Sequence, residues 1–345
     1  MHCGVLMYRR RYKAKILIFL LLAGIFAMFM LKLGSDRPHR LSDMEPANPF
    51  SENEKAIVEL AEIHPERTLR VAVDGSVVEM GLEDYVMGVL AAEMPASFSM
   101  EALKAQAVAA RTLAVHKIMF GGCSKYRGAD ICDESGHCQA YITTKEMKDK
   151  WMAKFDEYAA KLRQAVSDTA GKIITYHGEP ILVLFHSSSS GYTESVENVY
   201  SKALPYLRSV PSPGEGTVTE LESREEFDRK WFVSTVNKAY PKAKLVAANL
   251  EKQVSIASRF PSGRAEKVRL GGVTVTGVEF RRLLELRSTN FSLDFNQYSI
   301  VVTAEGYGHG VGMSQYGAEA MAREGNDYAD ILSYYYTGVK IEDMK

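Results

Sequence analysis

The chain has 345 residues, a formal net charge of -1 and 46% hydrophobic residues, enough apolar content for one large or two modest domains. The near-neutral charge gives no overall attraction to nucleic acid, because the basic residues are spread along the chain except at the extreme N-terminus. We therefore expect a folded globular protein that does not bind nucleic acid.

The N-terminus has the pattern of a membrane anchor. A short basic flank, residues 1–15, precedes an uninterrupted apolar run, Ile16–Leu31, that extends to Gly34. A helix over this run spans roughly 30 Å, the thickness of a bilayer core. The basic flank predicts that residues 1–15 are a cytoplasmic tail, that residues 16–34 cross the membrane and that the remainder is extracytoplasmic. A removable signal peptide is the alternative, but no small-x-small cleavage site follows the run.

The segment after the anchor reads as a linker. Residues 35–66 are polar and contain four prolines, Pro38, Pro46, Pro49 and Pro65, which is typical of a tether. We expect one extracytoplasmic domain to occupy residues 67–345.

The first elements of that domain are predicted to be a hairpin and two helices. Residues 69–73 and 77–80 flank Asp74-Gly75, the pattern of a tight β-turn. Residues 82–92 then favour a helix, Pro95 interrupts it, and Ser97 or Ser99 can cap a second helix that reaches about residue 117. The two helices would meet at Glu93.

The remaining elements mix helices and short strands without βαβ alternation, which favours an α+β fold over a doubly wound sheet. A helix is expected over residues 145–169, with Gly171 as its C-cap, and others over residues 278–286 and from about 315 to 324. Strands are expected at residues 172–176, 181–186, 254–259, 265–270, 273–276 and, as the last strand, 298–304.

Glu93 lies in a segment that suits acid/base chemistry. It is flanked by small and apolar residues in Ala91–Phe98, where a carboxylate is poorly solvated. Desolvation raises the pKa of a glutamic acid and lets it hold a proton near neutral pH for donation to a leaving oxygen. The alternative is that Glu93 only places a negative charge at the N-terminus of the second helix.

Two basic residues of the second helix, Lys104 and Arg111, lie seven positions apart and therefore share a face. That face would line a groove beside Glu93. The alternative is that both are ordinary solvated charges.

A serine-rich segment, residues 185–194, follows the expected strand that ends at His186. Its hydroxyls can give hydrogen bonds to a sugar, and it lacks the G-x-S-x-G pattern of a nucleophilic serine. A plain serine-rich turn is the alternative.

A glycine-rich segment, residues 306–317, contains His309 between Gly308 and Gly310 and ends near Gln315. It is not a dinucleotide fingerprint, because Val311 stands where the third glycine should be. Alternating glycines let a backbone approach a ligand closely, so we expect this loop to contact a polar ligand or to shape the site. A structural histidine is the alternative.

Three cysteines and a histidine lie close together in a polar loop. They are Cys123, Cys132, His137 and Cys138. A Cys₃His set suits a tetrahedral zinc ion, with Asp130 or His116 as substitutes for one ligand. The alternative, one disulfide and a free thiol, leaves an odd exposed cysteine on the oxidising side of the membrane.

Together these motifs resemble the stage II sporulation protein D and amidase-enhancer family of bacterial cell-wall proteins. The resemblance covers about residues 69–338. Its ordered motifs are Ala92–Phe98, Lys104–Thr112, Phe185–Ser189 and Gly308–Ala318.

The resemblance implies a glycan-binding groove and a lytic transglycosylase that cleaves peptide-stripped peptidoglycan strands during engulfment in endospore formation, at the septal or engulfing membrane. Glu93 matches the catalytic glutamate of the family. The residues expected to bind the glycan are Lys104, Arg111, His186, Ser187, Ser188, Ser189, Tyr192, His309, Gly310 and Gln315.

The resemblance also implies a cofactor and partners. The cysteine loop is similar to the zinc-binding loop of clostridial members, and the zinc would be structural rather than catalytic because it lies apart in sequence from Glu93. The expected partners are a sporulation amidase, stage II sporulation protein P, and the membrane protein stage II sporulation protein M. A glycan-binding scaffold that stimulates an amidase without chemistry of its own is the second hypothesis.

Overall fold

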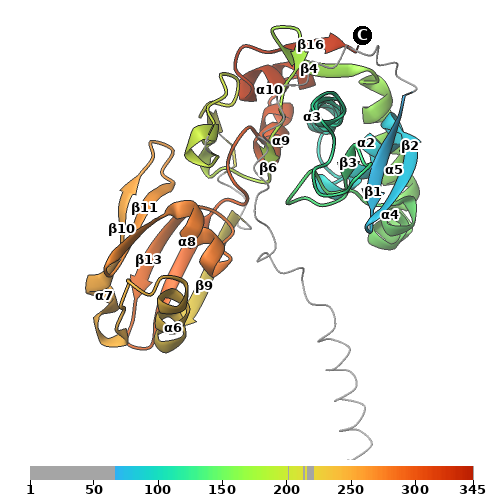
Figure 1. The fold of residues 1–345 in the computed structure, drawn as a ribbon. Coiled ribbons are helices and arrows are strands. Elements are labelled where there is room, and N and C mark those ends of the chain that lie inside the picture. The colour runs from blue at the N-terminus through green and yellow to red at the C-terminus, as the bar shows by residue number, and fades with distance from the viewer. Residues whose placement is uncertain (1–66, 201, 213, 216–220, 345) are drawn as a thin grey trace, which may run out of the picture. The chain divides into compact units, whose positions relative to one another are not determined.

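The computed structural model describes residues 67–344, apart from residues 201, 213 and 216–220 (Figure 1). The expected tail, membrane anchor and linker, residues 1–66, lie outside the described part. Within that part, we find no helix whose length and hydropathy would suit a membrane span. Every feature below belongs to one of the chain's two compact units, residues 44–345.

The domain opens with the predicted hairpin. Strands β1 (Thr68–Val73) and β2 (Ser76–Gly81) pair antiparallel across Asp74 and Gly75. Both turn residues have positive φ, 49° and 78°, the left-handed geometry that Asp-Gly turns provide. A short strand from the cysteine loop, β3 (Ile131–Cys132), adds to β1 in parallel. The hairpin is thus connected directly to the cysteine loop.

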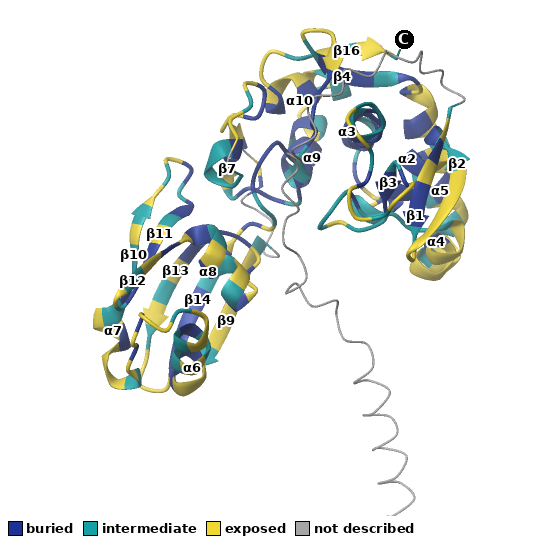
Figure 2. Cartoon of the chain, viewed as in Figure 1, coloured by how far each residue is buried: buried dark blue, intermediate teal, exposed yellow. Residues whose placement is uncertain are grey.

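Helix α3 (Met100–Met119) is the centre of the first hydrophobic core. Its alanines allow close approach on all sides, and its middle residues are buried (Figure 2). Packed against it are α2 (Leu82–Glu93), α5 (Phe155–Asp168), α9 (Gln315–Arg323), α10 (Tyr328–Tyr335) and strand β4 (Lys172–Tyr176). Helix α3 is therefore packed between helices that are near it in the sequence, α2 and α5, and two helices from the C-terminal part of the chain, α9 and α10.

The single helix predicted at residues 145–169 is interrupted. Helix α4 (Thr144–Trp151) ends in a 3₁₀ turn, Met152–Lys154, before α5 begins. Met152 has φ of 48°, which breaks the α-helical path, while Trp151 packs against the ring of Tyr158 with centroids 5.7 Å apart. Helical periodicity continues across the break, which is why the sequence does not reveal it.

Two predictions for the strands were wrong in part. Of the predicted strand 181–186, only β6 (Phe185–His186) is regular, and it pairs in parallel with β15 (Met313–Ser314). The strand predicted as last, β14 (Ser299–Glu305), is followed by β15 and by β16 (Lys340–Asp343), which pairs with β4. Strand β4 also pairs with β5 (Glu179–Pro180), and β7 (Gly191–Tyr192) pairs with β8 (Pro211–Ser212).

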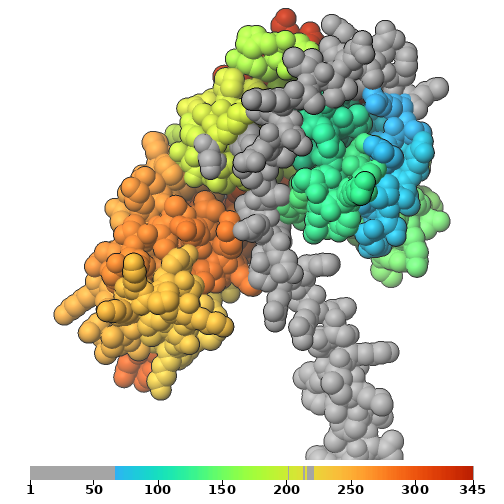
Figure 3. Space-filling model, viewed as in Figure 1, coloured from blue at the N-terminus to red at the C-terminus, as the bar shows by residue number. Residues whose placement is uncertain are grey.

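Residues 222–305 build a second hydrophobic core. This segment is coloured yellow to orange in the space-filling view (Figure 3). One antiparallel sheet is β10 (Val254–Arg259), β11 (Ala265–Leu270) and β12 (Val273–Thr276), all three as predicted. The other has the order β13 (Asn290–Phe295), β14, β9 (Glu222–Asp228). The helices of this segment are α6 (Arg229–Ala239), α7 (Leu250–Gln253) and α8 (Gly277–Leu284). The α+β class with short, mostly antiparallel strands is confirmed.

Candidate functional site

Glu93 is the last residue of α2, and its carboxyl group is enclosed by protein although the residue keeps some exposed surface. Burial raises the pKa of Glu93 to about 7. The alternative role at the start of α3 is taken by another carboxylate, because Oε2 of Glu319 accepts a hydrogen bond from the backbone N–H of Ser99 at 2.5 Å. Glu93 instead ends a helix, where the helix dipole disfavours a negative charge.

Three groups oppose that burial by favouring the carboxylate form of Glu93. The backbone N–H of Ala140 donates to Oε1 of Glu93 at 2.6 Å, and the side chain of Gln315 forms a second hydrogen bond. The ammonium of Lys150, which donates to the carbonyl of Ala91 at 2.8 Å, adds a nearby positive charge. Because burial outweighs these contacts and leaves the pKa of Glu93 at about 7, the carboxyl can give up and regain a proton near neutral pH.

The loop that carries Ala140 is held against α2 by close packing. A Cβ atom on Gly88 would lie 2.1 Å from the ring of Tyr141, so only glycine allows this approach. Tyr141 stacks on Tyr85 with ring centroids 5.6 Å apart, and the N–H of Ile142 donates to the carbonyl of Gly88 at 3.3 Å. The loop therefore presents the N–H of Ala140 to Glu93 in a fixed position.

Two buried glutamines, Gln106 and Gln139, lie beside this site, and the sequence analysis identified neither of them. The amide of Gln315 donates to Oε1 of Gln106 at 3.3 Å, and Gln139 donates to the hydroxyl of Tyr85 at 3.1 Å. Nε2 of Gln106 and Oε1 of Gln139 are buried and have no protein partner. A signal was available for Gln106, because a polar residue among alanines in a fully buried helix requires a polar neighbour.

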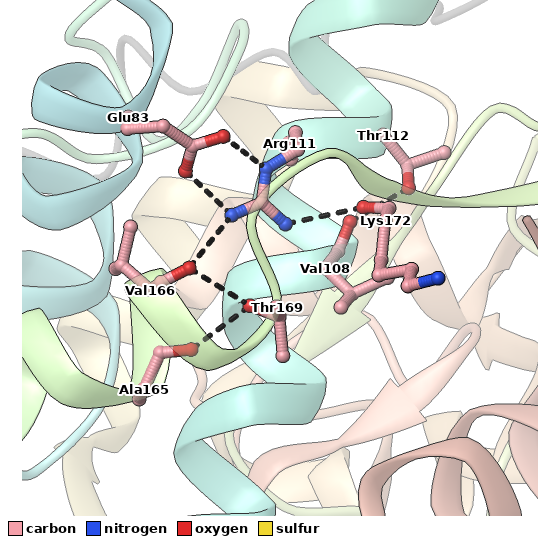
Figure 4. A network of polar contacts seen from close by, with 8 residues as sticks. All are labelled: Glu83, Val108, Arg111, Thr112, Ala165, Val166, Thr169 and Lys172. Carbon is pink, nitrogen blue, oxygen red and sulfur yellow. Dashed lines mark hydrogen bonds and ion pairs between the residues drawn. The ribbon is translucent and has the colours of Figure 1, made fainter. Parts of the chain in front are cut away.

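Arg111 forms an ion pair with Glu83 (Figure 4). Glu83 lies in the first turn of α2, whereas Glu93 is the last residue of that helix. The guanidinium of Arg111 donates to both carboxylate oxygens of Glu83 at 2.8 and 2.6 Å and to the backbone carbonyls of Lys172 and Val166 at 3.1 and 3.4 Å. Arg111 is fully buried, and the hydrogen bonds and charge contact found for Glu93 among the described residues involve Ala140, Gln315 and Lys150 rather than these partners. Arg111 therefore links α3 to α2 through Glu83 and to α5 through the carbonyl of Val166.

Lys104 shares this face of α3, as predicted, but the face packs against α5 rather than opening to a groove. Its ammonium pairs with Glu101 at 2.9 Å and with Asp168, the last residue of α5, at 3.0 Å. Helix α5 therefore occupies the place where the groove beside Lys104 and Arg111 was expected. The seven-residue spacing predicts that the two side chains share a face of α3, but it does not predict which element packs against that face.

The residues of the serine-rich segment differ in their surroundings: some form hydrogen bonds within the protein, and others are unpartnered or exposed. Ser189 is buried, and its N–H and hydroxyl donate to Glu215 at 2.6 and 2.8 Å. Oγ of Ser188 is buried without a protein partner, whereas the carbonyl of Ser187 accepts from the N–H of Tyr316 at 3.0 Å. Tyr192, in β7, is half-exposed. Ser189 thus fixes the segment, and Tyr192 faces outward.

His186 and His309 come together, with ring centroids 5.8 Å apart. Burial lowers the pKa of both, to about 3 for His309, so both rings are neutral. Nδ1 of His309 accepts from the N–H of Val311 at 3.0 Å, and Nδ1 of His186 donates to the carbonyl of Val311 at 3.2 Å. Nε2 of His186 is left as a buried acceptor without a protein partner.

The glycines of the 306–317 loop serve protein packing, which corrects the expectation that they leave room for a ligand. A Cβ on Gly308 would lie 2.8 Å from the Cβ of His186, and one on Gly310 would lie 2.5 Å from the guanidinium carbon of Arg264. The space beside Gly310 is thus occupied by an arginine. The loop shapes the site, as the sequence also suggested.

The cysteine cluster assembles as predicted from the sequence. The ligand atoms of Cys123, Cys132, His137 and Cys138 all lie within 4.8 Å of one another, and the three cysteines form no disulfide. Nδ1 of His137 lies 3.3 Å from Sγ of both Cys132 and Cys138 and 3.6 Å from Sγ of Cys123. Hydrogen bonding to Cys138 lowers the pKa of Cys132 to about 4. A convergent set with thiolate character suits a soft divalent cation.

Sequence comparisons relate the chain to known proteins. The sequence model of the family described as "Stage II sporulation protein" matches residues 74–176, which include Glu93 and the cysteine cluster. The chain is similar to the amidase enhancer of Bacillus subtilis (strain 168), with 30% identity over 302 residues that cover 74% of this chain and 40% of that protein.

Similarity is broader to two proteins named stage II sporulation protein D. Those of Bacillus subtilis (strain 168) and Bacillus amyloliquefaciens are each 37% identical to this chain, over 268 and 273 residues. In both cases the match covers 78% of this chain and 76% of the relative. The chain therefore belongs to the stage II sporulation protein D family.

Proposed function

We propose that this protein is a peptidoglycan lytic transglycosylase. It would cleave peptide-stripped glycan strands between N-acetylmuramic acid and N-acetylglucosamine and leave 1,6-anhydro ends. The observation that carries the proposal is the enclosed carboxyl of Glu93, whose pKa is raised to about 7 by burial. A group with this pKa is suited to act first as an acid and then as a base at neutral pH.

The proposed reaction needs only this carboxyl. Glu93 donates its proton to the glycosidic oxygen, and the bond from that oxygen to the muramoyl C1 breaks. The Glu93 carboxylate then takes the proton of the muramoyl C6 hydroxyl, whose oxygen bonds to C1 and closes the anhydro ring. Ala140, Gln315 and Lys150 stabilise the carboxylate between the two steps.

The alternative of ordinary glycoside hydrolysis is less well supported. Most hydrolases pair the acid with a second carboxylate that attacks the sugar or activates water. Among the described residues, the charged group that acts on Glu93 is the Lys150 ammonium, and no carboxylate contacts it. A reaction in which the sugar supplies its own nucleophile fits this single carboxyl.

The glycan would lie along β6, β15 and the loops that follow them. Gln315 bonds to Glu93 and follows Ser314, which pairs with His186 across the β6–β15 ladder. Sugar hydroxyls are suitable partners for the unpartnered Nε2 of His186 and Oγ of Ser188. Ser187, Tyr192 and His309 belong to the same segments.

We also propose a structural zinc ion at Cys123, Cys132, His137 and Cys138. Three sulfur atoms and one imidazole nitrogen within 4.8 Å of one another fit a closed tetrahedral set. A zinc ion there would hold the loop that leads to Ala140 and leave no coordination position for substrate. His137 and Cys138 are adjacent in the sequence, and their ligand atoms still converge, because Nδ1 of His137 lies 3.3 Å from Sγ of Cys138.

The cellular setting is proposed from the family. The names of the relatives indicate a stage of sporulation, so we place the protein at the septal or engulfing membrane during endospore formation, anchored by residues 16–34 with its N-terminus inside. Stage II sporulation proteins P and M are its proposed partners there.

The competing function is a non-catalytic glycan-binding activator of a cell-wall amidase, favoured by the 30% identity to an amidase enhancer. The test is to incubate the purified full-length protein with peptide-free strands, beside its Glu93→Gln variant. Cleavage by the wild type and none by the variant supports the transglycosylase. If neither cleaves but the wild type accelerates an added amidase, the activator is the correct function.

A further inference from the structure

Gln139 lies between the cysteine cluster and the loop residue that contacts Glu93. It directly follows Cys138 and precedes Ala140, whose N–H donates to Oε1 of Glu93 at 2.6 Å. Because that N–H belongs to the planar peptide group between Gln139 and Ala140, the position of Gln139 fixes one end of the plane. The direction of this hydrogen bond therefore depends on what holds Gln139.

The side chain of Gln139 is held by two helices. Its Nε2 donates to the hydroxyl of Tyr85 in α2 at 3.1 Å and to the backbone carbonyl of Ala110 in α3 at 3.2 Å. A carbonyl oxygen can only accept a hydrogen bond, so the amide nitrogen of Gln139 has to face Ala110, and this fixes the orientation of the amide. Gln139 is 1% exposed, so both bonds lie in the interior of the protein.

Tyr85 contacts both chain neighbours of Ala140. Its hydroxyl accepts from Gln139, and its ring stacks on that of Tyr141 with centroids 5.6 Å apart and an interplanar angle of 8°. Tyr85 is fully buried and belongs to α2, the helix that ends at Glu93. The helix that carries Glu93 thus also carries the side chain that holds the loop on either side of Ala140.

Stability alone does not account for a glutamine at position 139. Oε1 of Gln139 is buried and has no hydrogen-bond partner among the described residues. An enclosed acceptor without a partner is unfavourable, and an apolar side chain of similar size would avoid that cost. Glutamine differs from such a side chain in supplying two N–H donors, one for each helix. These two donated bonds, which hold the loop, are the contribution that an apolar residue lacks.

We propose that Gln139 and Tyr85 form a positioning pair that directs the N–H of Ala140 at Glu93. The inference rests on the proposed function and adds two residues that act on the reaction without touching the substrate. In the proposed mechanism this N–H stabilises the Glu93 carboxylate between proton donation and proton return, a stage that follows substrate binding. Loss of the pair should therefore lower kcat and leave KM nearly unchanged.

The test compares kcat and KM of the full-length protein on peptide-free strands for Gln139→Met, Tyr85→Phe and the double variant. Tyr85→Phe keeps the ring that stacks on Tyr141 and removes only the hydroxyl. We expect Gln139→Met to lower kcat about tenfold, as for loss of a hydrogen bond to a charged group, and to change KM less than about twofold. Tyr85→Phe should have a smaller effect. The double variant should be little worse than Gln139→Met, because both changes break the same contact.

Thr112→Val is the matched control. Thr112 in α3 is another fully buried polar residue, and its hydroxyl donates to the carbonyl of Val108 at 2.6 Å and accepts from the N–H of Ile174 at 2.9 Å. The control should lower the melting temperature at least as much as Gln139→Met and leave kcat unchanged. An equal fall of kcat in Thr112→Val would show that kcat only follows stability, and it would overturn the inference.

Hydrogen exchange separates this inference from the proposed function, because it needs no substrate. Exchange at the N–H of Ala140 should be at least about tenfold faster in Gln139→Met than in the wild type, and unchanged in Thr112→Val. If Gln139→Met exchanges like the wild type, or cleaves strands with the same kcat, the positioning role is wrong and the transglycosylase proposal is unaffected. If the wild type cleaves no strands while Gln139→Met still exchanges faster at Ala140, only the proposed function is wrong.

Discussion

The backbone N–H of Ala140 donates to Oε1 of Glu93 at 2.6 Å, and Ala140 follows Cys138 of the cysteine cluster by two residues. The sequence interpretation separated the cluster from Glu93 because the two lie apart along the chain. In the fold, the loop from the cluster returns to α2 and provides a wall of the site. A metal at the cluster would therefore support the position of a catalytic hydrogen bond without taking part in the reaction.

The activity should decrease as the pH rises through about 7. The mechanism requires protonated Glu93 in the free enzyme, and its pKa is raised to about 7 by burial. The measurement is kcat/KM on peptide-free strands from pH 3 to 9. A falling limb near pH 4.5, the ordinary value for a glutamic acid, would show that Glu93 is not enclosed in solution.

The raised pKa of Glu93 also predicts that the free energy of unfolding depends on pH. Folded Glu93 keeps its proton between pH 4.5 and about 7, whereas the unfolded chain loses it, so the free energy of unfolding falls as the pH rises through this window. The loss is on the order of 3 kcal/mol at most. Urea unfolding at pH 5 and pH 8 should show a smaller difference for Glu93→Gln than for the wild type.

Gln315→Leu should move the falling limb of the pH profile to higher pH. The hydrogen bond from Gln315 lowers the pKa of Glu93, so its loss leaves burial less opposed and raises that pKa further. The substitution also leaves the buried amide of Gln106 without its partner, and the maximal rate should drop about tenfold or more. A reduced rate with an unmoved limb would mean that Gln315 contacts only the substrate.

Arg111→Met should reduce stability and leave glycan binding intact. The substitution removes a fully buried guanidinium and strands the carboxylate of Glu83, at a cost of about 2–4 kcal/mol. The double variant Glu83→Gln/Arg111→Met should recover part of that loss. Lys104→Met, which breaks a more exposed pair, should cost less than about 1 kcal/mol. A large rise in KM for Arg111→Met without loss of stability would restore its predicted role in binding.

Removal of a metal should loosen the loop over Glu93. We expect one zinc ion per chain by elemental analysis, and chelation should increase deuterium exchange at the N–H of Ala140 and Ile142. After chelation without reductant, all four cysteines of the chain should react with an alkylating agent. Two unreactive cysteines would instead demonstrate a disulfide.

Gly88→Ala should reduce both stability and activity. The added methyl would lie 2.1 Å from the ring of Tyr141 and displace the loop that carries Ala140. Overpacking of this kind costs about 1–3 kcal/mol. Thermal unfolding and cleavage rate should fall together, and a variant with wild-type activity would show that the loop can move without loss of the hydrogen bond.

Local sequence patterns predicted much of the fold. The Asp74-Gly75 turn, the helices on either side of Pro95 and the strands 254–259, 265–270 and 273–276 depend on turn chemistry and periodicity, which act over a few residues. The break at Met152 and the two-residue pairing of β6 with β15 depend on packing between distant segments. No local pattern encodes them.

The residues of the candidate site also differ in how well the sequence predicts their roles. Glu93 was singled out by its apolar setting and by the family resemblance, and its catalytic role stays a prediction. The convergence of Cys123, Cys132, His137 and Cys138 was predicted from their close spacing and is confirmed. Arg111 was misplaced because its spacing on α3 gives a face, while the tertiary fold supplies Glu83 to cover that face.

The most direct test of the central claim is cleavage of peptide-free strands in ¹⁸O-labelled water by the full-length protein, followed by mass spectrometry of the new ends. Ring closure by the sugar's own C6 hydroxyl predicts 1,6-anhydromuramic ends without ¹⁸O, and none with Glu93→Gln. Reducing ends that carry ¹⁸O would contradict the account, because water would then be the nucleophile and a second catalytic group beside Glu93 would be required.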